Sequence, residues 1–372
     1  MQNTLPSAVD VLVVGGGPAG LAAAIAARQH GLSVLVADGA APPIDKACGE
    51  GLMPDGIEAL RELGVTIPEQ QAQRFRGIRF VNGKQRAEAV FPRGEACGVR
   101  RTVLHELLIE RAAASGVELA WRSPVAGVDS EGAMVGQGLV RARWIVGADG
   151  TGSRVRRWAG LDERRHNHVR YAFRRHYRVR PWTDLMELHW GRRCQIYVTA
   201  VGDAEVCVAM VSEDSRLRLE AALGEFPELR PRLEYAEHTS TERGAVTVSR
   251  KLRRVYKGTT ALIGDASGGV DSITGEGLCL AFRQAALLGE CLAAGDLARY
   301  HAGHARLMRR PELMARLMLF MAGHEGMRRR AMRVFEVNPR CFAGMLAMHV
   351  GGGSARNYLF NGAALGWRLL GA

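Results

Sequence analysis

Residues 9–38 read VDVLVVGGGPAGLAAAIAARQHGLSVLVAD, and this stretch decides the fold. The apolar, β-branched run at 9–14 is typical of a strand that is buried on both faces. The turn GGGPAG at 15–20 leads into an alanine-rich helical pattern that ends at Gly31. A second apolar run follows and ends at Asp38. These signals predict a strand, a glycine-rich turn, a helix and a second strand that closes with an acid.

The glycines of the turn have separate physical tasks. Gly15 makes the tight turn, Gly17 lets the backbone approach a diphosphate, and Gly20 lets the helix pack closely on the sheet. The helix N-terminus offers free N–H groups and a partial positive charge to that diphosphate. The carboxylate of Asp38 can accept two hydrogen bonds from an adenosine ribose, and it disfavours a 2′-phosphate. The pattern therefore predicts a site for FAD or NAD rather than NADP.

Two further stretches place an acid at the end of an apolar strand. Residues 144–156 read WIVGADGTGSRVR, and residues 260–281 read TALIGDASGGVDSITGEGLCLA. Asp149 and Asp265 then lie at the carboxyl ends of buried strands, where α/β sheets bind ligands. We expect Asp265 to hydrogen-bond a ribityl chain. The helix start at 274–278 can offer backbone N–H groups to the pyrimidine end of a flavin.

The order of these motifs resembles the p-hydroxybenzoate-hydroxylase-type family of FAD-dependent oxidoreductases. The resemblance is carried by the glycine turn with Asp38, by the pair Arg101 and Leu104, by D-G-x-x-S-x-x-R at 149–156 and by the G-D and T-G-E-G stretches within 264–277. The CGEGLMP stretch at 48–54 is most similar to the geranylgeranyl-reductase-like branch of this family. The resemblance covers residues 8–300 and implies a Rossmann-like FAD-binding domain.

The resemblance also implies roles for matching positions. Arg101 would lie near the diphosphate, Val125 would meet adenine through its backbone, and Asp149 with Arg156 would form a motif associated with FAD and NAD(P)H. The predicted FAD-binding residues are Gly15, Gly17, Pro18, Ala19, Gly20, Asp38, Lys46, Cys48, Gly49, Arg101, Val125, Asp149, Gly264, Asp265, Gly275, Glu276, Gly277 and Leu278. The sequence has no second G-x-G-x-x-G, so NAD(P)H would dock transiently as an electron donor.

The chain of 372 residues is too long for one simple core, which predicts more than one lobe. We expect an α/β fold with a discontinuous Rossmann-like FAD-binding domain, an antiparallel β-sheet substrate domain and a helical C-terminal part. The FAD-binding domain would comprise residues 1–75, 99–165 and 251–298. The substrate domain would comprise residues 76–98 and 166–250, and the helical region residues 299–372.

Strand signals with short turns fill residues 168–212 and predict an antiparallel sheet that covers the flavin. Tyr197, His189 and Trp190 in this sheet are candidate pocket residues, and ordinary sheet packing is the alternative for each. Cys48 could touch substrate or donate a proton, or it could be a small residue that fits a tight loop. Cys48 and Tyr197 are therefore the catalytic candidates. The spacing of His and Cys predicts no metal site.

Residues 300–349 show amphipathic helical patterns with Met, Leu and Phe on one side and arginines between them. We expect Pro311 and Gly323 to break this run. Two interpretations stay open. The helices could cap the core, or they could form an apolar tunnel or a peripheral contact with a membrane surface.

The composition of the chain limits the kinds of partner that it can bind. The net charge is +12, which suits anions such as FAD, nicotinamide phosphates and membrane surfaces, although a GC-rich genome would also enrich arginine. No nucleic-acid motif accompanies the charge, so we predict no nucleic-acid partner. Seven scattered cysteines and an N-terminus without a basic signal region predict reduced thiols and a cytoplasmic protein. The sequence does not predict an oligomeric state.

Three functions fit this pattern. We favour an NAD(P)H-driven monooxygenase that hydroxylates an aromatic or polyketide-like hydrophobic substrate. The alternative is a flavoenzyme that reduces carbon–carbon double bonds of a lipid, which the CGEG and TGEG stretches favour. A minor alternative is a non-catalytic FAD-binding protein. Gly268 and Ser272 stand where the hydroxylase pattern has His and Pro, which weakens the hydroxylase interpretation.

Overall fold

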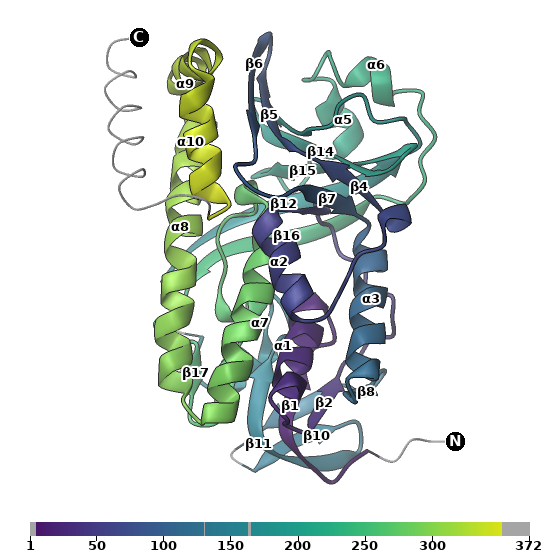
Figure 1. The fold of residues 1–372 in the computed structure, drawn as a ribbon, viewed down its shortest axis with the longest axis vertical. Helices are drawn as coiled ribbons and strands as arrows, with labels where there is room; N and C mark the ends of the chain where they lie inside the picture. Colours follow the sequence, from purple (N-terminus) through teal and green to yellow (C-terminus); the bar gives the residue numbers. More distant parts are fainter. Residues whose placement is uncertain (1–4, 130, 163–164, 352–372) are drawn as a thin grey trace.

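The first large sheet lies in the lower half of the molecule (Figure 1). The structure is a computed structural model that describes residues 5–129, 131–162 and 165–351. In this sheet β17 and β18 are followed in order by β11, β1, β2 and β8, and the hairpin of β9 and β10 extends from β11. Apart from β17 and that hairpin, the strands pair in parallel. The bounds are β1 Ala8–Val14, β2 Val34–Ala37, β8 Glu118–Ala120, β9 Val125–Val128, β10 Gly132–Val135, β11 Gly138–Gly147, β17 Tyr256–Lys257 and β18 Thr260–Leu262.

The second large sheet lies in the upper half and has the order β16, β12, β15, β14, β13, β5, β6. All neighbours are antiparallel except β13 and β5, which pair in parallel. The predicted antiparallel sheet is thus confirmed, with this one parallel pair. The bounds are β5 Gly77–Asn82, β6 Gln85–Val90, β12 Arg165–Tyr177, β13 Met186–Trp190, β14 Cys194–Gly202, β15 Glu205–Ser212 and β16 Arg243–Lys251. A small third sheet joins β3 Gly51–Leu52, β7 Ala96–Val99 and β4 Ala72–Phe75.

Helices cover both sheets. The helices are α1 Pro18–Gln29, α2 Pro54–Glu62, α3 Arg101–Ala114, α4 Arg154–Trp158, α5 Leu219–Leu223, α6 Arg230–Leu233, α7 Gly277–Ala294, α8 Leu297–Gly323, α9 Glu325–Val337 and α10 Pro339–His349. Short 3₁₀ turns lie at Glu69–Gln71, Gly264–Ser267 and Ser272–Thr274. The α/β class with a helical C-terminal part is therefore confirmed.

Helices α1 and α7 pack closely in the core beside the first sheet. Residues 21–27 of α1 are small or branched apolar residues, and all of them are buried. A Cβ atom added at Gly289 of α7 would lie 2.9 Å from the backbone of Ala26. The two helices can approach this closely because alanine faces glycine at their contact.

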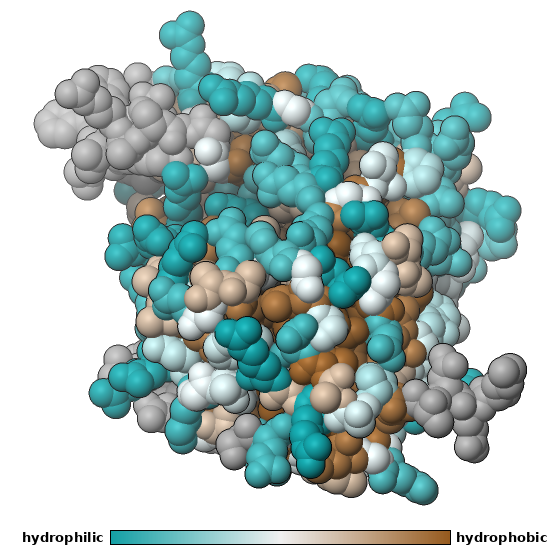
Figure 2. Space-filling view, turned by 60° about the horizontal axis from the view of Figure 1, so that its bottom comes forward, coloured by the Kyte–Doolittle hydropathy of each residue, from teal (hydrophilic) through white to brown (hydrophobic). Residues whose placement is uncertain are grey.

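Among the described residues, one helix, α7, is long and apolar enough to cross a membrane by length and composition alone. Its buried residues include Phe282, Ala285 and Leu288, which belong to the main hydrophobic core. A helix buried in a protein core can have the same length and apolar composition, so α7 is not evidence for a membrane span. The surface seen in Figure 2 is largely hydrophilic around its rim, with hydrophobic residues gathered nearer the middle of that face.

The expectation that Pro311 would break the C-terminal helical run is wrong. Helix α8 continues through Pro311 and ends at Gly323, as expected for that glycine. Proline removes one backbone hydrogen bond and costs about 3 kcal/mol in a helix interior. Met308, Pro311 and Met314 are all buried, and we expect this tertiary packing to offset the cost of the proline.

Gly289→Ala tests the contact between α1 and α7. We expect a net loss of about 1 kcal/mol in the free energy of unfolding, because overpacking costs about 1–3 kcal/mol and outweighs the gain in helix propensity of about 1 kcal/mol. The matched control is Gly326→Ala in α9, where an added Cβ meets no atom within 4 Å. Urea denaturation would measure both variants. Equal stability of the two would contradict this account of the contact.

Candidate functional site

A cavity of about 580 Å³ lies where the carboxyl ends of the parallel strands meet the second sheet. From the first sheet and its loops it is lined by Val14, Asp38, Asp149 and Asp265, and from the second by Met186, Tyr197 and Thr247. Of the predicted FAD-binding residues, all but Gly20 and Glu276 line this cavity. The cavity therefore joins motifs that are far apart in the sequence.

The glycine turn has the predicted division of tasks. Gly15 has a φ of +112°, and a Cβ there would lie 2.5 Å from the carbonyl oxygen of Ala148. A Cβ at Gly20 would lie only 1.9 Å from the carbonyl oxygen of Gly15, so Gly20 serves the packing of α1 and does not reach the cavity. Gly17 lines the cavity, and an added Cβ there would meet nothing within 4 Å. The backbone at Gly17 is thus open to a ligand.

His105 of α3 supports this turn, and the sequence analysis missed it. The backbone N–H of Ile44 donates to Nδ1 of His105 over 3.3 Å, so Nε2 carries the ring proton and donates to the carbonyl oxygen of Gly16 over 2.8 Å. Burial lowers the pKa of His105 and so keeps the ring neutral. A lone histidine within a helical pattern gives no signal of this kind, because both of its partners lie more than 60 residues away.

Asp38 ends β2 and lines the cavity as predicted. One carboxylate oxygen accepts a hydrogen bond of 2.7 Å from the backbone N–H of Gly16, and the other accepts one of 2.7 Å from Ala40. These bonds fix the carboxylate against the turn. Each oxygen retains a lone pair with which it can accept a hydrogen bond from a ribose hydroxyl.

Asp265 lines the cavity beside Lys46. Its Oδ2 accepts hydrogen bonds from Nζ of Lys46 over 2.8 Å and from the hydroxyl of Thr151 over 3.2 Å. Burial raises the pKa of Asp265, but the Lys46 ammonium and these hydrogen bonds outweigh burial, and the pKa is lowered overall. Asp265 is thus a fixed anion that orients Lys46 in the cavity wall.

Asp149 also lines the cavity, whereas Arg156 does not. Oδ2 of Asp149 accepts hydrogen bonds from the backbone N–H groups of Arg154 and Val155, over 2.6 Å and 3.1 Å. The buried guanidinium of Arg156 donates to Asp162 and to the carbonyl oxygens of Ala266 and Thr151. Arg156 therefore ties the two acidic loops together behind the cavity.

Glu50 lies beside Cys48 in the cavity wall, and its carboxylate is turned into the protein. Oε1 accepts from the backbone N–H of Arg101 over 3.0 Å, and Oε2 accepts from Nε2 of His176 over 2.6 Å. Glu50 has a φ of +58°, which is uncommon for a residue other than glycine. We expect these side-chain bonds to hold the strained turn in place.

Potential ligand atoms of Glu50, His176 and Cys207 lie within 4.8 Å of one another, a spacing that could hold a metal ion. The guanidinium groups of Arg100 and Arg174 each lie 3.2 Å from Nδ1 of His176. Two cations beside the ring oppose a metal dication. The cluster is therefore better described as a buried network of charged hydrogen bonds.

The T-G-E-G stretch divides between two environments. Gly275, Gly277 and Leu278 line the cavity, and an added Cβ at either glycine would meet nothing within 4 Å. The side chain of Glu276 turns away, and its Oε2 lies 3.6 Å from Nδ1 of His349 in α10. Burial and the nearby Asp55 carboxyl raise the pKa of Glu276 to about 8, and burial lowers the pKa of His349 to about 4.

The three candidates in the second sheet have different environments. Tyr197 lines the cavity and donates its hydroxyl proton to the carbonyl oxygen of Ile273. Burial raises the pKa of Tyr197, so its hydroxyl stays protonated. His189 pairs with Glu187 over 3.0 Å, and Trp190 packs edge-on against Phe80. Neither lines the cavity, so the alternative of ordinary sheet packing holds for both.

The residues of the cavity fit FAD. The open backbone at Gly17, Gly275 and Gly277 forms a cradle that side chains would fill. Nε of Arg101 and Oδ1 of Asp149 are buried and have no hydrogen-bond partner within the described part of the chain. Buried polar groups are generally paired, so these two atoms point to a ligand that carries both donors and acceptors. A dinucleotide with a diphosphate and ribose hydroxyls has that chemistry.

The comparisons with known proteins agree with this site. A family model described as the FAD binding domain matches residues 8–215. The chain is similar to digeranylgeranylglycerophospholipid reductase of Thermoplasma volcanium, with 29% identity over 72% of this chain and 74% of that protein. It is similar to menaquinone reductase of Mycobacterium tuberculosis, with 28% identity over 80% and 79%. The solved flavoprotein/dehydrogenase of Cytophaga hutchinsonii shares the fold, with a TM-score of 0.85, 21% identity and coverage of 98% and 99%.

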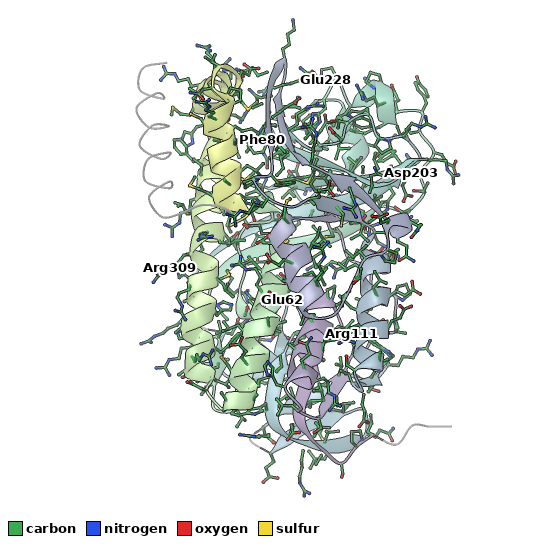
Figure 3. The ribbon with its side chains drawn as sticks, in the orientation of Figure 1. Glu62, Phe80, Arg111, Asp203, Glu228 and Arg309 are labelled. Carbon is green, nitrogen blue, oxygen red and sulfur yellow. The ribbon has the colours of Figure 1, made fainter. Side chains whose placement is uncertain are left out.

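Asp265→Ala removes the anion that orients Lys46, and we expect binding of FAD to weaken at least about tenfold, as for the loss of a charged hydrogen bond. The flavin absorbance of the purified variant and a titration with FAD would measure this. Asp203→Ala is the control, because Asp203 is exposed on the turn after β14, at the edge of the molecule (Figure 3), and does not line the cavity. A purified Asp265→Ala protein that keeps its full yellow colour would refute the assignment.

Glu276→Gln tests the buried acid through the pH dependence of stability. The folded protein holds the Glu276 proton up to about pH 8, whereas the unfolded chain releases it near pH 4.5. Between these values the folded state binds more protons, so the free energy of unfolding falls as pH rises. His349 acts in the opposite direction, but only below its unfolded pKa of 6.5.

In the native protein we therefore expect the free energy of unfolding to fall by roughly 1–2 kcal/mol between pH 6.5 and pH 8 because of Glu276. Glu276→Gln should remove this fall. Urea denaturation across this range would measure it. Glu58→Gln, at an exposed position of α2, is the control for the loss of one carboxylate. An unchanged pH slope in Glu276→Gln would mean that Glu276 is ionised in the folded protein.

Proposed function

The chain belongs to the FAD binding domain family and is an FAD-dependent oxidoreductase, and from this basis we propose that it reduces a carbon–carbon double bond in an aliphatic, lipid-like substrate. The named relatives are reductases of isoprenoid lipids or of a quinone, which supports a reductase. The monooxygenase favoured from the sequence stays a prediction. The two reactions differ in the group with which the reduced flavin reacts, which is a carbon–carbon double bond in one and molecular oxygen in the other.

The observation that carries this proposal is a second, apolar cavity beside the first. It is narrow, about 30 Å³, and lies between the second sheet and the C-terminal helices. Met186 and Tyr197 line both cavities, so the second begins where the first ends. Its other walls are Ile78, Phe80, Leu188, Ile273, Thr274, Met314, Met318, Phe342, Met345, Leu346 and His349.

The chemistry of this lining suits a hydrocarbon chain. Methionine side chains are flexible, so Met314, Met318 and Met345 can move apart to admit an apolar ligand. Tyr197 and His349 are the titratable groups of this lining, and burial favours the neutral form of both. An aromatic acid or a charged polyketide would find no partner for its charge in such a lining.

The chain's own residues would bind, orient and shield the reacting groups. A bound flavin supplies the hydride chemistry. Arg101 and Lys46 would attract its diphosphate, Asp38 would hold its adenosine ribose, and the apolar cavity would exclude water from the substrate. NAD(P)H remains our proposed transient electron donor, since exposed Arg154 and Trp158 at the cavity wall offer a cation and an aromatic face. We also keep the proposal that the protein acts in the cytoplasm.

The test is the fate of reduced flavin. We expect anaerobically reduced enzyme to be reoxidised by a polyunsaturated isoprenoid alcohol in detergent, with loss of double bonds measured by mass spectrometry. Slow, featureless reoxidation by air would accompany it. A transient flavin hydroperoxide band in air, with oxygen inserted into an aromatic substrate, would instead establish the monooxygenase.

Met318→Trp should fill the second cavity. We expect turnover of the isoprenoid alcohol to fall about tenfold or more, since the indole would stop the methionines from moving apart, and each methylene that a pocket fails to bind costs about 1–3 kcal/mol. Flavin binding should stay unchanged, because Met318 does not line the first cavity. Ala302→Trp, at an exposed position of the same helix, is the control. Unchanged turnover in Met318→Trp would exclude this cavity as the chain-binding site.

A further inference from the structure

The outward face of α8 carries a regular pattern of cations and apolar side chains. Arg306, Leu313 and Phe320 follow one another at intervals of seven residues, which places them along one line of the helix. Leu313 is 65% exposed and Phe320 is 46% exposed. Arg309 and Arg316 are exposed and lie on the adjacent line, and Figure 3 shows Arg309 pointing away from the body of the protein.

This face is strongly positive. Glu312 is the one acidic residue of α8 and neighbours Arg309 and Arg316, but its carboxylate pairs with Lys251 over 2.9 Å. Helix α9, which follows directly, carries exposed Arg330 and Arg333 and exposed Val337, and also exposed Glu325 and Glu336. We define Arg306, Arg309, Leu313, Arg316 and Phe320 as the α8 surface.

We propose that the α8 surface docks on an anionic lipid bilayer. Arginine binds phosphate groups with two parallel hydrogen bonds, which suits lipid headgroups. Leucine and phenylalanine beside arginine favour the boundary between headgroups and acyl chains, where a surface helix buries its apolar side chains. A nucleic acid or an acidic protein would satisfy the arginines, but it would leave the line of Leu313 and Phe320 without a hydrocarbon partner.

The same helix links this surface to the apolar cavity. Met314 and Met318 on the inner side of α8 line that cavity, whereas Leu313 and Phe320 face outward. A helix with its side chains is about 10 Å across, so docking would bring the cavity within about that distance of the lipid. This link to substrate supply rests on the proposed function, but docking on the bilayer does not.

The experiment is co-sedimentation of the full chain with vesicles, without substrate. We expect binding to vesicles of phosphatidylcholine mixed with phosphatidylglycerol, weak binding to phosphatidylcholine alone, and weaker binding to the mixture as salt rises. Each arginine near an anionic surface is worth about fivefold in binding, so R306Q/R309Q/R316Q should bind roughly 100-fold more weakly. L313S/F320S should lose about tenfold, because less apolar area enters the bilayer.

The matched control is R180Q/R192Q/R216Q, which removes three exposed arginines near the second sheet and should bind like the native chain. Equal binding by the two triple variants would overturn the proposal, and so would equal binding to both kinds of vesicle. If L313S/F320S bound as tightly as the native chain, the surface would be a general polyanion site and not a bilayer contact. Failure of the reductase test alone would leave these results unaffected.

Discussion

The approach of α1 to the end of β1 is the constraint on which the rest of the structure depends. The carbonyl oxygen of Gly15 occupies the space that a side chain at position 20 would need. Helix α1 can therefore begin directly at the end of the strand, with its free N–H groups directed at the cavity. Helix α7 then packs against α1 through Gly289 and Ala26, and the loop before α7 completes the opposite wall. One close contact thus sets the positions of two walls of the site.

The rest of the cavity is positioned mainly by backbone hydrogen bonds to side chains. Asp38, Asp149, Glu50 and His105 each bind a backbone N–H or carbonyl group of a neighbouring loop. Side chains held in this way lose little conformational freedom when a ligand arrives, which favours binding. Nε of Arg101 and Oδ1 of Asp149 remain without partners within the described residues, although both side chains belong to the cavity wall.

The sequence predicted the parts of this site that depend on local geometry. A glycine-rich turn after a buried strand can adopt few backbone conformations. Gly15, Gly17 and Asp38 could therefore be placed from their spacing alone. Glu276 could not, because its direction depends on α10, which follows some 60 residues later in the chain. His189 and Trp190 lie on a predicted strand, but which face of a strand meets a cavity depends on its neighbours. The pairing of Glu50 with His176 joins segments 126 residues apart, for which a single sequence carries no signal.

The network around Glu50 has a consequence for how the molecule can open. It joins the loop after β2 to α3 through Arg101, and to β12 of the second sheet through His176 and Arg174. Any hinge motion between the two sheets would separate buried charges from their partners, which is costly. Polar hydrogen bonds tie α9 to β5 and β6, but α8 and α10 line the second cavity with flexible methionines and a phenylalanine, which can rearrange more easily. We therefore expect a bulky ligand to enter beside the C-terminal helices, while the interface between the two sheets stays closed.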